Sequence, residues 1–260
     1  MAPEQLREME STLTRMTILP DEGTSAGFAY RVDYRPAFAL GTIRLDPNGA
    51  VSAQAGAMVS MSDDMELTSR LEGGIVGALK RTAGGRSAFV STFTAGPQGG
   101  ELTVAPSTPG DIVPIRVENG ECHVAAAAYL ASGSGLEIET NWAGARGFFA
   151  SDRLFLLRVS GTGTLFTSAF GALHTKTLEP GERYSIDSGH VITWDSAMDY
   201  RVRKAANTLF RSFTSGEGFI VEFTGPGTIL MQTRNLEAFA HSLAMVSGTG
   251  GDRSGLSIEL

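Results

Sequence analysis

Apolar residues at alternating positions recur along the chain, and this pattern predicts short β-strands. Residues at positions i, i+2 and i+4 of a strand point to the same face, so an apolar set with this spacing marks the buried side. The pattern occurs at three places separated by 66 and 64 residues. These three faces are Phe89, Ser91 and Phe93; Phe155, Leu157 and Val159; and Phe219, Val221 and Phe223.

Turn signals accompany these faces at matching intervals. Residues 46–49 (DPNG), 118–121 (ENGE) and 179–182 (EPGE) each combine glycine with asparagine or proline, which favours a turn. A stretch resembling residues 57–67 follows each signal, at 128–138 and again at 189–200 with one extra residue. Glycine-rich turns are also predicted after the three apolar faces, at residues 95–100, 161–163 and 225–227.

Matching turns and faces predict an all-β chain built from three tandem repeats, with short flanking helices. Leu6, Met9, Leu13 and Met16 have helical spacing, which predicts an amphipathic helix before the repeats. A closing helix is expected over residues 235–246, followed by a loose tail. The expected divisions are 1–27 for the N-terminal helical extension, 28–111, 112–174 and 175–234 for the three β repeats, and 235–260 for the closing helix and tail.

Composition and charge narrow the classes of function. The 260 residues carry a formal net charge of −7, which disfavours a general nucleic-acid binder. Cys122 is the only cysteine, so no internal disulfide forms, and a reducing cytoplasm is the expected location. The longest apolar run, residues 124–131, is far shorter than the roughly 20 residues of a spanning helix. The first residues are acidic and lack the apolar core of a signal peptide.

Four motifs resemble those of the altered-inheritance-of-mitochondria protein family. They are residues 109–115 (PGDIVPI), 154–163 (LFLLRVSGTG), 187–192 (DSGHVI) and 218–227 (GFIVEFTGPG), with 232–239 (QTRNLEAF) continuing the last. The resemblance covers roughly residues 28–240. It implies that each repeat has the fold of the tryptophan RNA-binding attenuation protein (TRAP), a short double-stranded β-helix or sandwich. It further implies a homotrimer whose nine units form a ring, and it brings no established activity or catalytic residues.

Candidate catalytic and metal-binding residues are sparse. None of the four histidines has a partner at zinc-ligand spacing. Glu182 and His190 faintly resemble half of a cupin metal site, but a hydrogen-bonded histidine near a turn is the stronger interpretation of His190. A buried and inert thiol is expected at Cys122. Asp187, Ser188 and His190 are close in sequence, but residues of one extended strand rarely form a triad. We therefore predict no enzymatic activity, no catalytic residue, no metal and no cofactor.

Phosphate and RNA sites receive little support. Residues 77–80 lack the ending of a phosphate-binding P-loop, and residues 161–163 lack the third glycine of a dinucleotide-binding turn. RNA binding around a ring would need repeated basic residues and stacking aromatics. Aromatic residues make up 8% of the chain and fall mostly on predicted buried faces. A small-ligand or RNA-binding module is the second hypothesis, and a metal-dependent cupin-like enzyme is the third.

Each repeat contains an insertion that is both basic and apolar. The insertions span residues 69–87, 141–153 and 203–217 and together carry a formal +6, which leaves −13 for the rest of the chain. A basic, apolar rim suits an anionic membrane surface or an acidic protein partner, whereas capping of a β-sandwich end or a subunit contact is the structural alternative. The predicted docking residues are Ile75, Leu79, Lys80, Arg81, Arg146, Phe148, Phe149, Leu209, Arg211 and Phe213. The sequence thus predicts a non-enzymatic oligomeric scaffold that docks a partner protein or a membrane.

Overall fold

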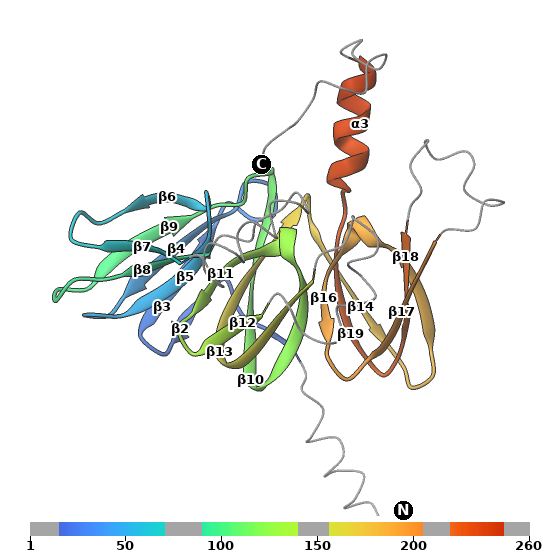
Figure 1. The fold of residues 1–260 in the computed structure, drawn as a ribbon, viewed down its shortest axis with the longest axis horizontal. Coiled ribbons are helices and arrows are strands. Elements are labelled where there is room, and N and C mark those ends of the chain that lie inside the picture. The colour runs from blue at the N-terminus through green and yellow to red at the C-terminus, as the bar shows by residue number, and fades with distance from the viewer. Residues whose placement is uncertain (1–15, 71–89, 140–155, 205–218, 247–260) are drawn as a thin grey trace, which may run out of the picture.

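Short antiparallel strands make up most of the structure, a computed structural model that describes residues 16–70, 90–139, 156–204 and 219–246. The strands follow one another along the long axis of the body, while helix α3 (Leu236–Val246) projects from it (Figure 1). The all-β prediction is confirmed, and α3 lies where the closing helix was expected. Most of the predicted N-terminal helix lies outside the described residues, and Met16, which the prediction included, is not helical but directly precedes a short strand. The strands are β1 (Thr17–Ile18), β2 (Glu22–Ser25), β3 (Phe28–Asp33), β4 (Leu40–Leu45), β5 (Ala50–Gln54), β6 (Met58–Met61), β7 (Glu66–Arg70), β8 (Val90–Thr94), β9 (Gly100–Val104), β10 (Gly110–Ala125), β11 (Tyr129–Gly133), β12 (Leu136–Glu139), β13 (Leu156–Phe170), β14 (Leu173–Leu178), β15 (Arg183–Asp187), β16 (Val191–Asp195), β17 (Asp199–Lys204), β18 (Phe219–Thr224) and β19 (Gly227–Gln232).

One set of antiparallel pairings recurs in three successive blocks of the chain. In the first block, residues 40–104, β4 and β6 pair with β9, while β5 and β7 pair with β8. In the third block, residues 173–232, β14 and β16 pair with β19, while β15 and β17 pair with β18. In the second block, residues 110–170, β10 pairs with β13 along its length, and β11 and β12 pair with opposite ends of β13.

A break in register occurs at the same place in each block. It lies between Met58 and Ser60 in β6, between Tyr129 and Ala131 in β11, and between Val191 and Thr193 in β16. One extra residue therefore interrupts each of these strands, as in a β-bulge. These breaks make Met58, Tyr129 and Val191 equivalent positions.

Two backbone pairings, which we call seams, join neighbouring blocks. In the first seam β5 pairs with β11, and in the second seam β10 pairs with β16. Through these seams the strands of all three blocks enter one 11-stranded sheet, which ends at β14 on one side and β7 on the other. The remaining strands form a five-stranded sheet, ordered β2-β3-β4-β9-β6, and a three-stranded sheet, ordered β15-β18-β17.

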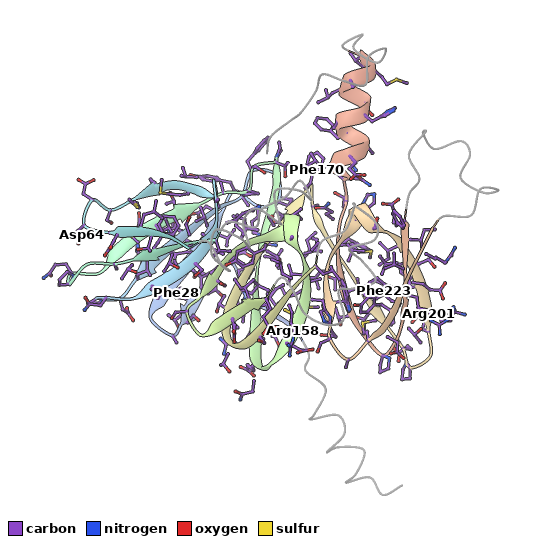
Figure 2. The ribbon with its side chains drawn as sticks, in the orientation of Figure 1. Phe28, Asp64, Arg158, Phe170, Arg201 and Phe223 are labelled. Carbon is purple, nitrogen blue, oxygen red and sulfur yellow. The ribbon has the colours of Figure 1, made fainter. Side chains whose placement is uncertain are left out.

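The buried apolar residues form two clusters, and each extends across a seam. In one cluster, Phe166 of the second block packs against Phe28 and Tyr30 with ring centroids 6.1 and 5.3 Å apart. The other cluster joins the second and third blocks and contains Trp194 and Phe223. Figure 2 shows Phe28 and Phe223 toward opposite ends of the body. The blocks are therefore joined by side-chain packing as well as by backbone hydrogen bonds.

Four of the six predicted turns have the expected positions, since residues 225–226 also connect β18 to β19, but two predictions were wrong. Residues 46–49, 95–100 and 179–182 form hydrogen-bonded turns, each closed by a backbone hydrogen bond of 2.8 to 3.0 Å. Residues 118–121 and 161–163, in contrast, lie within the continuous strands β10 and β13. The two strands pair across this region with a shift of register between Val117 and Gly120, so the glycine-rich stretches form an irregularity in a long ribbon.

An ion pair fixes the connection between β3 and β4 to the start of β10. Arg35 donates from Nε and Nη2 to the two carboxylate oxygens of Asp111, at 2.6 and 2.9 Å. Asp111 is buried, and Arg35 also contacts Asp21. The hydrogen bonds that Arg35 donates to Asp111 raise the pKa of Arg35 above its ordinary value. This side-chain pair stabilises the contact between the β3–β4 connection and the second block.

We expect the substitution Arg35→Leu to lower the free energy of unfolding by about 2 kcal/mol, because it leaves a buried carboxylate without its cationic partner. Urea denaturation followed by circular dichroism measures this loss. Arg31→Leu is the matched control, since Arg31 pairs with Asp33 on the exposed surface. The control should cost about 0.5 kcal/mol or less. Equal losses in the two variants would contradict the role assigned to Arg35.

Candidate functional site

The two residues that faintly resembled a cupin half-site make local structural contacts. Glu182 accepts a hydrogen bond from the backbone N–H of Glu179 at 2.9 Å and pairs with Lys176 at 2.9 Å. The bond from the Glu179 N–H, followed by the contact with Lys176, lowers the pKa of this carboxyl group. His190 contacts the carbonyl oxygen of Gln232 through Nδ1 at 2.8 Å, so this ring nitrogen is the donor. Glu182 therefore closes a turn, and His190 ties a short 3₁₀ turn to β19.

The other residues considered for chemistry also have structural partners. Asp187 accepts hydrogen bonds from the backbone N–H of Gly189 at 2.9 Å and from the Asn235 side chain at 3.2 Å. Ser188 is buried within the 3₁₀ turn Ser188–His190. Among the described residues, no group of three or more histidine, cysteine, aspartate or glutamate side chains is placed to hold a metal ion.

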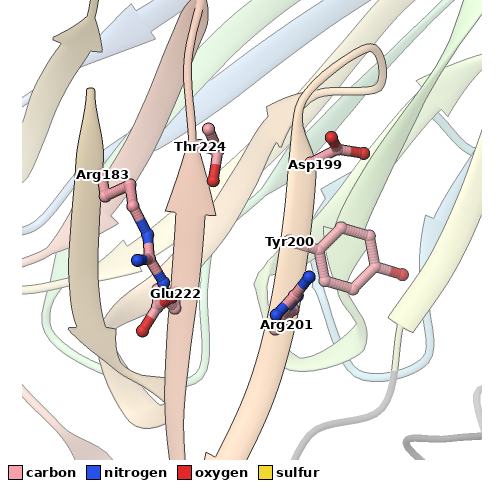
Figure 3. Close-up of a pocket in the computed structure, with 6 residues that line it drawn as sticks. All are labelled: Arg183, Asp199, Tyr200, Arg201, Glu222 and Thr224. Carbon is pink, nitrogen blue, oxygen red and sulfur yellow. Dashed lines mark hydrogen bonds and ion pairs between the residues drawn. The ribbon is translucent and has the colours of Figure 1, made fainter. Parts of the chain in front are cut away.

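A small polar hollow lies on the three-stranded sheet near the end of the body. It has a volume of about 330 Å³. Figure 3 shows Arg183 reaching across to Glu222 on the neighbouring strand, and these two side chains form an ion pair. Arg203 also contacts Glu222, at 3.4 Å. The side chains that line the hollow are Arg183, Asp199, Tyr200, Arg201, Glu222 and Thr224. The lining thus contains charged groups of both signs, and the ion pair of Arg183 with Glu222 lies among them.

Cys122 and His123 lie at the second seam, where they are buried. Cys122 is opposite Asp195, and His123 is opposite Trp194, with the two rings 5.4 Å apart. Burial raises the pKa of the Cys122 thiol to about 12 and lowers the pKa of His123. The expectation of a buried thiol is therefore confirmed. Both side chains contribute to the packing of β10 against β16.

The feature that stands out is a pair of exposed strand edges. β6 forms one edge of the five-stranded sheet, and β15 forms one edge of the three-stranded sheet. Within the part of the chain that the structure describes, neither strand has a partner on its outer side. The exposed apolar side chains include Met58 and Val59 on β6 and Tyr184 on β15. An edge with unpaired backbone groups and apolar side chains can accept a strand from another molecule.

Sequence reasoning missed these edges and favoured the insertions. All ten predicted docking residues lie outside the described residues. The described strands do show that the three insertions connect equivalent pairs, namely β7–β8, β12–β13 and β17–β18. A signal for the edges was present in the alignment of residues 57–67 with 128–138, which matches Val59 to the buried Leu130. Val59 is exposed, whereas the matching Leu130 is fully buried.

Comparison with known proteins places the chain in a family. The family model for mitochondrial biogenesis AIM24 matches residues 30–234. The chain belongs to the AIM24 family. An uncharacterised protein of Streptococcus pyogenes serotype M6 is 33% identical over 223 residues, which cover 82% of this chain and 89% of that protein.

A solved structure shares the architecture of this AIM24 chain. The X-ray crystal structure of a Streptococcus pyogenes protein superposes with a TM-score of 0.67 at 30% sequence identity. The match covers 89% of this chain and all of the other. These relatives confirm the family resemblance seen in the sequence motifs, and they assign no activity to the AIM24 fold. In the described ranges of this chain, no helix has the length and apolar character needed to cross a bilayer.

We expect the Cys122 thiol to react with Ellman's reagent at pH 8 roughly 1,000-fold more slowly than a thiol of ordinary pKa, because the reactive thiolate is correspondingly scarcer. The ordinary pKa is 9.0, against about 12 in the folded chain. The measurement is the rate of thionitrobenzoate release from native protein. The same protein unfolded in urea is the control and should react at once. Rapid reaction of the native protein would contradict the burial of this thiol.

Proposed function

We propose that this protein is a non-enzymatic scaffold that assembles from identical copies into a ring-shaped homotrimer. We further propose that the three blocks are tandem copies of one TRAP-like unit, so that a trimer contains nine units. The observation that carries this proposal is the threefold recurrence of the strand pairings, including the register break in β6, β11 and β16. A chain of repeated units joined by one kind of contact extends or closes through that same contact.

The distribution of side-chain chemistry favours assembly over catalysis. The polar residues that drew attention in the sequence close turns, tie strands together or fill a seam. The outer sides of β6 and β15, by comparison, pair with no strand of the described chain, although both strands expose apolar side chains. Open edges of this kind are usually covered, shortened or charged in monomeric proteins. Assembly gives these edges a partner.

Docking of the assembled scaffold is assigned to the three insertions. Each insertion connects equivalent strands, so a ring would present equivalent insertions at equivalent places. Their combined charge of +6 contrasts with the chain's net charge of −7. An anionic membrane surface or an acidic protein would be attracted to such segments.

Native mass spectrometry of the untagged protein tests the assembly. We expect a main species with three times the 27.4 kDa mass of the chain and no further bound mass. A monomer at micromolar concentration would overturn the scaffold proposal. A trimer that carries a defined metal or oligonucleotide in full occupancy would favour a binding or enzymatic function instead.

Charge reversal tests the docking role. We expect Arg211→Glu to weaken binding to vesicles that contain anionic lipid by roughly 30-fold. The change removes a basic residue that contributes about 1 kcal/mol near such a surface and adds an acidic one that costs about as much. Co-sedimentation with vesicles measures this change. Arg201→Glu makes the same change of charge on β17, outside the insertions, and should have a smaller effect. Unchanged binding to both vesicles and protein partners in Arg211→Glu would remove the support for docking.

A further inference from the structure

The two exposed edges belong to sheets at opposite ends of the body. β6 lies in the five-stranded sheet near one end, and the β15-β18-β17 sheet lies at the other end (Figure 1). A single chain therefore cannot join its own two edges in this conformation. Each edge is available for a strand of a second molecule.

The two seams inside the chain show how such edges pair. In the first seam, Val51, Ser52 and Ala53 are opposite Gly133, Ser132 and Ala131. In the second seam, Cys122, His123 and Val124 are opposite Asp195, Trp194 and Thr193.

Both seams use the same register. The pairing of β5 with β8 and of β10 with β13 makes Ser52 and His123 equivalent positions. The pairing of β11 with β13 and of β16 with β19 makes Ser132 and Trp194 equivalent positions. The two contacts between neighbouring blocks therefore have the same strand register.

The exposed edges occupy the same two places in the repeating pattern. β6 is the equivalent of β11 and β16, because each carries the register break and pairs with the last strand of its block. β15 is the equivalent of β5 and of the later half of β10, because their partners β18, β8 and the first half of β13 are equivalent strands. The third block thus presents one half of a seam in β15, and the first block presents the other half in β6.

Burial of the equivalent residues supports this assignment on the β6 side. Val59 is 57% exposed, whereas its equivalents Leu130 and Ile192 are fully buried. Met58 is 40% exposed, whereas Tyr129 and Val191 are each only 2% exposed. The exposed apolar residues of β6 are therefore at positions that a neighbouring block covers elsewhere in the chain.

The β15 side shows the same difference. Tyr184 is 38% exposed, whereas its equivalents Val51 and Cys122 are 1% and 0% exposed. Both edges therefore lack a cover of the kind that the neighbouring block provides at the two internal seams.

We propose that β15 of one copy pairs antiparallel with β6 of the next copy and thereby forms a third seam. Transfer of the internal register sets Tyr184 opposite Ser62, Ser185 opposite Met61, and Ile186 opposite Ser60 of the neighbouring copy. The three-stranded and five-stranded sheets then join into one sheet of eight strands. This inference rests on the proposed assembly and names the surface through which it forms.

Charge and symmetry agree with this register. Continuing the ladder by one residue brings Arg183 opposite Asp63 of the next copy, and opposite charges that face each other across strands favour pairing. Both residues are exposed in the single chain. The contact is head-to-tail because the two edges differ, and such contacts close into a ring when the rotation between copies permits it.

Paired cysteines test the register directly. The double variant Met61→Cys with Ser185→Cys should form disulfides between chains, because opposite residues of antiparallel strands have Cα atoms roughly 4.5 to 5.5 Å apart. Non-reducing electrophoresis should then show covalent oligomers. Ser52→Cys with Ser132→Cys occupies the same position of the first seam and should form a disulfide within one chain.

A slipped pair provides the matched negative control. Ser60→Cys with Ser185→Cys differs from the test pair by one residue on β6, and this shift points the two side chains to opposite faces. We expect roughly tenfold less cross-linking from this pair. Equal cross-linking of the test and slipped pairs would overturn the register.

The possible results test the β6–β15 seam and the proposed trimer separately. A native trimer whose test pair cross-links no better than the slipped pair overturns the β6–β15 seam, while the proposed scaffold stands. A monomeric wild-type protein overturns both. Cross-linking of the test pair in a native trimer supports both.

A charged substitution on β6 provides an independent measurement. We expect Val59→Asp to weaken association by roughly 100-fold in native mass spectrometry, because the carboxylate would be buried in the seam. Leu67→Asp is the matched control, since Leu67 is an exposed apolar residue on β7, which is not part of the seam. Circular dichroism should show that both variants are folded. A folded trimer of Val59→Asp would contradict the seam.

Discussion

Every β-strand at the edge of a sheet presents backbone N–H and C=O groups that need partners, and this requirement organises the whole chain. β5 and the later half of β10 each have one side left open by their own block. The next block covers that side with β11 or β16. The folding of one block is therefore tied to that of its neighbour, and the large sheet is a consequence of these two pairings rather than of any block alone.

The side chains at the seams follow from the same requirement. A residue between two blocks must fit both, which explains why Tyr129 sits in the core yet contacts the carbonyl oxygen of Ser52 through its hydroxyl group at 3.3 Å. Asp195 is buried at the second seam, where its carboxylate accepts backbone N–H groups of Met16 and Thr228, both at 2.7 Å. Buried polar groups with specific partners favour one register over its neighbours. The seams thus combine apolar burial with a few directional contacts.

Much of the fold could be predicted because the repeated signals are local. Alternation at Phe219, Val221 and Phe223 marks a strand face whatever the strand packs against, and the closing helix has its own apolar spacing. Residues 118–121 show where local reasoning fails. Asparagine and glycine permit a turn there, but the long pairing of β10 with β13 continues through the region and turns the signal into an irregularity. The sequence of residues 118–121 allows either a turn or a continuous strand, and the pairing of β10 with β13 selects the strand.

The candidate site was harder to predict, because the exposure of a strand edge depends on whether a neighbouring block pairs with it. Val59 resembles Leu130 and Ile192 in sequence, and only the structure shows that it alone is uncovered. The other edges indicate that this exposure is not general. β7, β14 and β17 carry charged residues such as Glu66, Lys176 and Arg203, which discourage pairing with another strand. β15 also carries Arg183, but the proposed register places this residue opposite an acidic one.

β6 differs from those three edges because it consists of Met58–Met61 and contains no charged residue. Its side chains and its open backbone groups would both be poorly accommodated in water. An edge without charged protection, at a position covered twice elsewhere in the same chain, is the kind of edge that the proposed β6–β15 seam would cover with another copy.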